Sequence, residues 1–123
     1  MSRVYYNKLI RDKIQDKILA RNEQCEVRVI ESDEEFEQEL LKKISEEAEG
    51  LAHARTREEF LSEYADLMVV LDALTAQLEI SEAELQVAMT ENVQKKGLFK
   101  QRHFLHWSSK HDYQSNESPQ GVQ

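Results

Sequence analysis

Three short patterns divide the middle of the chain into helices and constrain its fold more than any other feature. Each starts with serine or threonine and has a glutamate three residues later: Ser32-Asp33-Glu34-Glu35, Thr56-Arg57-Glu58-Glu59 and Ser81-Glu82-Ala83-Glu84. The hydroxyl can accept a hydrogen bond from an amide that a helix start leaves unsatisfied, so the pattern is typical of helix N-termini. We therefore predict that three helices begin near residues 33, 57 and 82.

An earlier segment, Asn7 to Ala20, has apolar residues at helical spacing and predicts a first helix. Residues 25–30 alternate weakly and predict one short strand or extended segment, which as a strand would need a partner. Three glycines and one proline are too few for the turns of a many-stranded fold. The expected fold class is all-α, with four helices and one short extended segment.

A chain of 123 residues fits a single domain, which we assign to residues 1–107. The fourth helix is expected to end near Lys95 and Lys96, since basic side chains suit a helix C-terminus and Gly97 suits a left-handed cap. Residues 108–123 are polar, and we expect them to form a mobile tail. A core this small must also support any active site, and oligomerisation would ease that limit.

The charge of the chain excludes one class of partner. Twenty-four acidic and 16 basic residues give a net charge of -8, which argues against a general affinity for nucleic acid. No apolar run approaches membrane-spanning length, and the N-terminus lacks the apolar stretch of a signal peptide. The single cysteine, Cys25, cannot form an intrachain disulfide, so a cytoplasmic location is expected.

The predicted second helix carries a carboxylate on its apolar face. At about 100° per residue, the residues of that face are Phe36, Leu40, Ile44, Leu51 and Ala54. Glu47 falls inside this arc, Glu46 and Gly50 lie along its border, and Glu49 points away. Glu47 is therefore the glutamate that an ordinary solvated surface does not explain.

The predicted third helix also carries carboxylates on an apolar side. Residues 67–74 are apolar nearly all round, which indicates burial against several neighbours or in an oligomer interface. Glu63 and Asp66 share one side of the helix and can approach Glu47 if the two helices form an antiparallel pair. Like charges in an apolar setting cost roughly several kcal/mol unless they are protonated or bind a cation. A bound cation with oxygen ligands is expected to be Mg²⁺ or Mn²⁺. The alternative interpretation is that these acids are surface salt-bridge partners and bind no metal.

Several blocks of sequence together resemble a known family. They are NKLIRDKI at residues 7–14, Glu46-Glu47, Glu63-Tyr64-Ala65-Asp66, KKGLF at 95–99, and then Arg102 and Phe104-Leu105. In this order and spacing they resemble the phosphoribosyl-ATP pyrophosphohydrolase-like branch of the MazG superfamily, over about residues 6–105. The resemblance implies a four-helix, MazG-like bundle that forms homodimers or homotetramers. It also implies a magnesium-dependent hydrolase that converts a nucleoside triphosphate into the monophosphate and pyrophosphate.

The resemblance further implies roles for individual residues. Glu47, Glu63 and Asp66 would hold the metal, and Glu46 would act as a ligand or, with Glu47, as a catalytic group that orients the attacking water. The candidate phosphate-binding residues are Lys8, Arg11, Lys13, Lys95, Lys96 and Arg102. The implied ligand is a nucleoside triphosphate or a related nucleotide, and the implied role is house-cleaning of nucleotide pools.

The chain departs from the family pattern at one position. The family motif is EExxE, and its last glutamate falls on Gly50, which has no side chain to bind a metal. Glycine inside a helix also costs about 0.5–1 kcal/mol relative to alanine. Two alternatives therefore stay open: a catalytically weakened nucleotide-binding or regulatory module on the same scaffold, and a non-enzymatic helical interaction protein.

Overall fold

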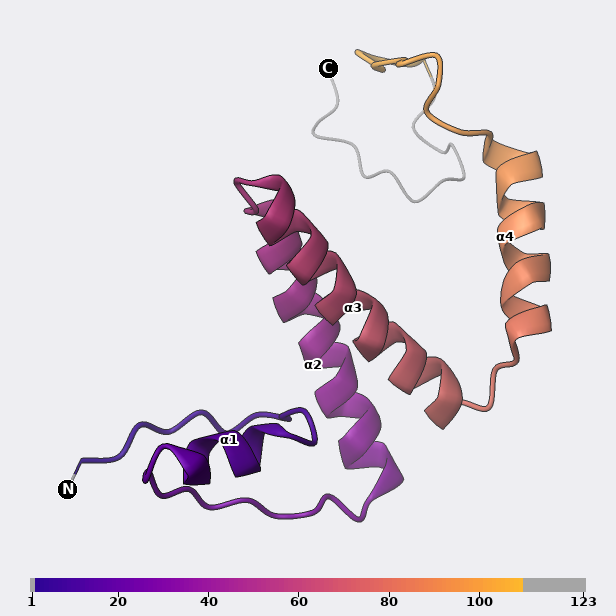
Figure 1. Ribbon diagram of the computed structural model, residues 1–123. Coiled ribbons are helices and arrows are strands. Elements are labelled where there is room, and N and C mark those ends of the chain that lie inside the picture. Colours follow the sequence, from indigo (N-terminus) through magenta and orange to yellow (C-terminus); the bar gives the residue numbers. More distant parts are fainter. Residues whose placement is uncertain (1, 110–123) are drawn as a thin grey trace. The chain divides into compact units, whose positions relative to one another are not determined.

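The computed structural model describes residues 2–109, and within that range it contains four α-helices and no strand. The helices, labelled in Figure 1, are α1 (Ile14–Ala20), α2 (Asp33–Ala52), α3 (Arg57–Gln77) and α4 (Glu82–Lys96). The predicted all-α fold class is thus confirmed.

Side-chain caps explain why three of these helices begin where they do. The hydroxyls accept hydrogen bonds from backbone amides three residues on: Ser32 from Glu35 at 3.2 Å, Thr56 from Glu59 at 3.1 Å, and Ser81 from Glu84 at 3.1 Å. Each bond satisfies an amide that the first helical turn cannot satisfy itself. The predicted starts of α2, α3 and α4 are therefore confirmed.

The first helix is much shorter than its apolar spacing predicts. It begins at Ile14 and not at Asn7, whose φ of 47° lies in the left-handed region and is incompatible with a continuous right-handed helix. The side chains of Lys8 and Arg11 instead form ion pairs with acids on α2 and α3. The helical preference of this segment is weak, and the predicted helix start was wrong.

The segment between α1 and α2 has no regular structure. Residues 25–30 form neither helix nor strand, so the strand interpretation was wrong. Arg28 donates to both carboxylate oxygens of Glu35, which ties this segment to the first turn of α2. Because the described residues contain no strand that could pair with it, the segment cannot form a sheet.

The packing that positions the candidate site is that of α2 against α3. The two helices form an antiparallel hairpin joined by residues 53–56 (Figure 1). Among the described residues, Leu40 of α2 and Val70 of α3 are the buried apolar side chains, at 3% and 7% exposure. The rest of the predicted apolar face of α2 is half-buried: Phe36, Ile44, Leu51 and Ala54. Glu47 shares this face, so the packing of α2 on α3 carries its carboxylate inward.

The chain divides into two compact units, the first ending at Leu85 and the second beginning at Gln86. In the second unit, α4 ends as predicted: Gly97 has a φ of 77°, and its amide donates to the carbonyl of Val93 at 2.7 Å. The predicted domain limit at residue 107 stays a prediction, and residues 110–123 of the predicted tail lie outside the described range. No helix in residues 2–109 is both long enough and apolar enough to cross a membrane.

Candidate metal centre

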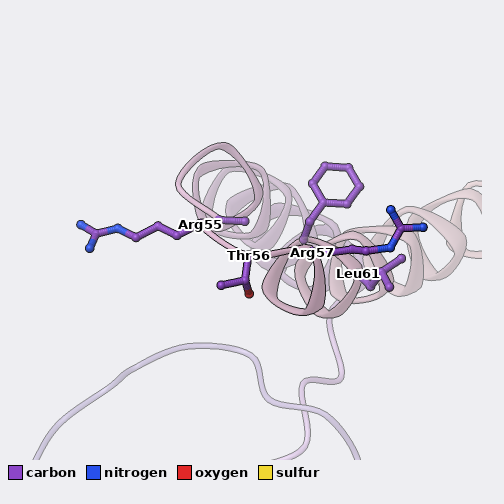
Figure 2. Close-up of a pocket in the computed structure, with 6 residues that line it drawn as sticks. Arg55, Thr56, Arg57 and Leu61 are labelled. Atoms are coloured by element: carbon purple, nitrogen blue, oxygen red, sulfur yellow. The ribbon is translucent and has the colours of Figure 1, made fainter.

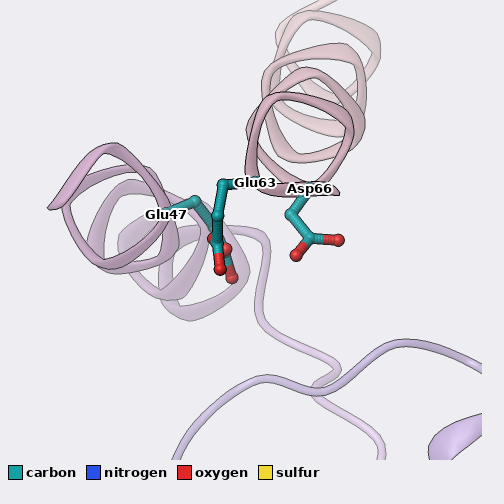
Figure 3. A group of neighbouring side chains, drawn as sticks. All are labelled: Glu47, Glu63 and Asp66. Atoms are coloured by element: carbon teal, nitrogen blue, oxygen red, sulfur yellow. The ribbon is translucent and has the colours of Figure 1, made fainter. Parts of the chain in front are cut away.

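Three carboxylates from the two helices of the hairpin lie together. Glu47 comes from α2, and Glu63 and Asp66 lie about one turn apart on α3. Each offers one oxygen, these oxygens all lie within 4.8 Å of one another, and all three residues are half-buried. Figure 3 shows the three carboxylates pointing to the same side of the hairpin. The pairing of the two helix faces thus brings together the residues that the helical wheels singled out.

The environment of Glu47 disfavours its charge. Burial is the main cause that raises its pKa above the ordinary value, and the neighbouring carboxylates of Asp66, Glu46 and Glu63 raise it further. Lys43 acts in the opposite direction. Ionised Glu47 therefore lacks sufficient compensating positive charge, which a bound divalent cation would supply.

Glu46 has a different environment although it is the next residue. Lys8 Nζ donates to its Oε1 at 2.8 Å, and Lys43 Nζ lies 3.6 Å from its Oε2. The hydrogen bond from Lys8 is the largest influence on Glu46 and lowers its pKa. The same bond raises the pKa of Lys8. Glu46 is thus held as a carboxylate beside the three-acid cluster, with about 44% of its side chain exposed.

The N-terminal segment brings a second cation to the cluster. Arg11 Nη1 lies 3.5 Å from Asp66 Oδ1, and both side chains are partly exposed. Together with Lys8, Arg11 places positive charge on the cluster from outside the helix hairpin. Two of the six predicted phosphate-binding residues therefore lie beside the carboxylates.

The other four predicted phosphate-binding residues are divided between the two units: Lys13 belongs to the first unit, and Lys95, Lys96 and Arg102 belong to the second. Lys13 is the exposed N-cap residue of α1. Lys95 and Lys96 form the last turn of α4, and Arg102 follows it with a φ of 58°. A phosphate-binding role for these four residues stays a prediction.

Glu49 and His53 stand apart from the carboxylate cluster. Glu49 is exposed, as the helical wheel indicated. His53 is the C-cap residue of α2, and its Nδ1 lies 2.8 Å from the carbonyl oxygen of Glu49. The imidazole thus contacts the end of its own helix.

Lys43 is a charged residue of the site that the sequence analysis missed. Its side chain is only 16% exposed, and it lowers the pKa of both Glu46 and Glu47. It precedes these glutamates by three and four residues, the spacing at which side chains meet on one helix face. That spacing was the available signal, although lysine and glutamate at such intervals are common on exposed helices.

The donor set and the local space fit a hard divalent cation. All three donors are carboxylates, which suit Mg²⁺ or Mn²⁺ better than Zn²⁺. Space beside the cluster is provided by Gly50, where a Cβ atom would lie 2.6 Å from Glu63 Oε2. The residues present would therefore supply three oxygen ligands, while Mg²⁺ ordinarily completes its shell with water and substrate phosphates.

A separate hollow lies at the turn between α2 and α3. Its lining residues are Ala54, Arg55, Thr56, Arg57, Phe60 and Leu61. Figure 2 shows the side chains of Arg55 and Arg57 extending in opposite directions, so their charges do not converge on one point. This arrangement contains none of the clustered carboxylates and offers no comparable set of ligands.

We compared the chain with known protein families, curated proteins and solved structures. The chain matches no protein-family model, and neither the curated proteins nor the solved structures contain a significant match.

Proposed function

We propose that this protein is a magnesium-dependent nucleoside triphosphate pyrophosphohydrolase. The observation that carries the proposal is the convergence of Glu47, Glu63 and Asp66, whose oxygens lie within 4.8 Å of one another. Three half-buried carboxylates repel one another unless a cation or protons compensate them. The resemblance of the sequence to pyrophosphohydrolases of the MazG superfamily supports a nucleotide as the substrate.

The proposed reaction assigns a task to each group of residues. Glu47, Glu63 and Asp66 hold Mg²⁺, which when bound neutralises phosphate charge and lowers the pKa of coordinated water. Glu46, kept ionised by Lys8, accepts a hydrogen bond from the attacking water and orients it. Lys8 and Arg11 stabilise the negative charge of the phosphate oxygens. Water adds to the α-phosphorus and gives its proton to Glu46, while the bond between the α-phosphorus and the α–β bridging oxygen breaks and pyrophosphate leaves.

The proposed role is house-cleaning of nucleotide pools. A cytoplasmic location belongs to the same proposal, since nucleotides are its substrates and one cysteine cannot form an intrachain disulfide.

The test is incubation of the full chain with Mg²⁺ and a panel of canonical and modified nucleoside triphosphates together with phosphoribosyl-ATP. Chromatography and a pyrophosphate assay should detect the monophosphate and pyrophosphate in equal amounts. Asp66→Asn should lower kcat/KM by about 100-fold or more, because it removes a charged ligand. Glu49→Gln, which removes an exposed carboxylate of the same helix hairpin, serves as the matched control and should stay active. No product from any substrate would contradict the proposal.

One observation favours a second candidate, a nucleotide-binding module with little turnover. The cluster in the described residues has three carboxylates, and Gly50 stands where the family pattern has another glutamate. In that case nucleotide and Mg²⁺ should raise the melting temperature of the protein, while the same panel yields no pyrophosphate.

A further inference from the structure

The backbone of Gly50 on α2 lies against the side chain of Glu63 on α3. A Cβ atom placed on Gly50 would lie 2.6 Å from Oε2, 3.0 Å from Cδ and 3.5 Å from Oε1 of Glu63. A separation below 3.0 Å is shorter than Cβ atoms in proteins adopt. The carboxylate of Glu63 therefore occupies the space that any other side chain at position 50 would need.

We propose that Gly50 is a positioning residue of the metal centre, which acts by leaving room for the Glu63 carboxylate beside Glu47 and Asp66. This inference rests on the proposed function, because it assumes that the three carboxylates bind a metal. Gly50 lies about one turn after Glu47 on α2, so it borders the cluster directly. The absence of a side chain thus contributes to the site, although glycine itself provides no ligand.

Because of this contact, a substitution at position 50 should affect metal binding and the stability of the fold differently. The atoms that a Cβ would meet are the end of a flexible glutamate side chain, which can rotate away without any movement of the backbone. Alanine also has a higher helix propensity than glycine in the interior of α2. Gly50→Ala should therefore keep or raise the stability of the metal-free protein, while it displaces the Glu63 carboxylate. A residue with only a structural role would not change metal affinity and stability in opposite directions.

The experiment compares wild type, Gly50→Ala and Glu49→Gln as full chains. Isothermal titration with Mn²⁺ gives the Kd, and circular dichroism in a chelating buffer gives the metal-free Tm. Gly50→Ala is expected to bind Mn²⁺ about 10- to 100-fold more weakly, the usual loss when a group that orients a ligand is altered. Its metal-free Tm should equal or exceed that of wild type, and Glu49→Gln should match wild type in both measurements.

A second pair of variants tests whether Gly50 acts through Glu63. Glu63→Asp retains a carboxylate but withdraws it from position 50 by one methylene group. In that background, Gly50→Ala should weaken Mn²⁺ binding by no more than about twofold, because the two residues are coupled. A further loss as large as in the wild-type background would overturn the inference.

The outcomes separate this inference from the proposed function. If wild type fails to bind Mn²⁺, the metal centre itself is contradicted and the inference with it. If wild type binds Mn²⁺ and Gly50→Ala binds it equally well, the inference alone is overturned. Weaker binding together with a lower metal-free Tm would also overturn it, since a scaffold defect would then explain the loss.

Discussion

Lys8 Nζ donates a hydrogen bond to Glu46 Oε1 at 2.8 Å, although 38 residues separate them in the chain. Both side chains are more than 40% exposed, so solvent screens the pair and its contribution to stability is small, about 0–1 kcal/mol. Its main consequence is local: Glu46 stays ionised, and a cation stays beside the carboxylate cluster. We therefore expect substitution of Lys8 to affect the proposed reaction more than the stability of the fold.

Substitution of Lys8 should separate these two contributions. Lys8→Gln is expected to lower kcat/KM for the nucleotide by about 10- to 100-fold, because a donor to the charged phosphate oxygens is lost. The free energy of unfolding should change by less than about 0.5 kcal/mol. Steady-state kinetics and urea unfolding measure the two effects. Arg21→Gln, which breaks the exposed 2.7 Å ion pair with Glu23, is the matched control. Equal activity in both variants would contradict the role of Lys8.

Substitution of Lys43 should change the affinities for a divalent metal and for a triphosphate in opposite directions. This half-buried cation lies 3.6 Å from Glu46 and also influences Glu47, so it should repel a divalent metal in the cluster. Lys43→Gln is expected to tighten Mn²⁺ binding about three- to tenfold, which corresponds to about 1 kcal/mol of screened repulsion. The same variant should bind a non-hydrolysable triphosphate more weakly, because phosphate loses a cation.

The neighbouring lysine provides the control for this prediction. Lys42 pairs with Glu39 at 2.6 Å, and its side chain is 73% exposed. Lys42→Gln should therefore leave both affinities close to those of wild type in calorimetric titrations. Weaker Mn²⁺ binding in Lys43→Gln would show that Lys43 supports the metal-binding geometry and does not oppose the metal.

The local features of the fold were predictable because their signals occupy a few adjacent residues. The hydroxyls of Ser32, Thr56 and Ser81 cap their helices as the sequence indicated, since a cap needs only residues within one turn. The start of α1 was not predictable in this way. Residues before Ile14 instead place Lys8 and Arg11 in ion pairs with the helix hairpin, and such distant contacts leave no local signal.

The candidate site was also predictable only in part: the sequence indicated which helix faces carry the carboxylates, but not the distances between the helices. Helical periodicity placed Glu47, Glu63 and Asp66 on faces that meet in an antiparallel pair, and the three carboxylates lie together. The approach of Glu63 to Gly50 depends on the separation of the two helices, which periodicity does not specify. The residue that appeared to be a missing ligand in the sequence therefore has a different interpretation in three dimensions.

Glu47 leads to a prediction about pH and stability. Its pKa in the folded protein is raised above the ordinary 4.5, mainly by burial and then by Asp66. An ionised Glu47 therefore lowers stability at pH values above its folded pKa, and this penalty disappears as the pH falls through that pKa toward the unfolded value. In chelating buffer at neutral pH, Glu47→Gln should raise Tm by about 2 °C, for roughly 0.5 kcal/mol after solvent screening.

The measurement is a series of thermal unfolding curves between neutral pH and about pH 4, near the ordinary carboxyl pKa. The difference in Tm between Glu47→Gln and wild type should shrink as the pH falls, because wild-type Glu47 then becomes neutral as well. Glu49→Gln removes an exposed carboxylate two residues away and should show no such trend. Addition of Mn²⁺ should reverse the order, with wild type the more stable protein. An equal or lower Tm for Glu47→Gln at neutral pH without metal would contradict the prediction.

The apolar surface of α3 leads to a prediction about assembly. Within residues 2–109, Leu40 and Val70 are the buried apolar side chains, whereas Met68 and Val69 remain 37% and 40% exposed in a nearly all-apolar stretch. So small a core is marginal for an independent domain, and a second copy that covers α3 would enlarge it. Light scattering coupled to size exclusion should therefore give a dimer or tetramer, which Val69→Lys should dissociate with a lower Tm. Val29→Lys, the same change at an 83% exposed position outside the helices, should preserve the assembly. A monomeric wild type at micromolar concentration would contradict this prediction, as would an unchanged mass for Val69→Lys.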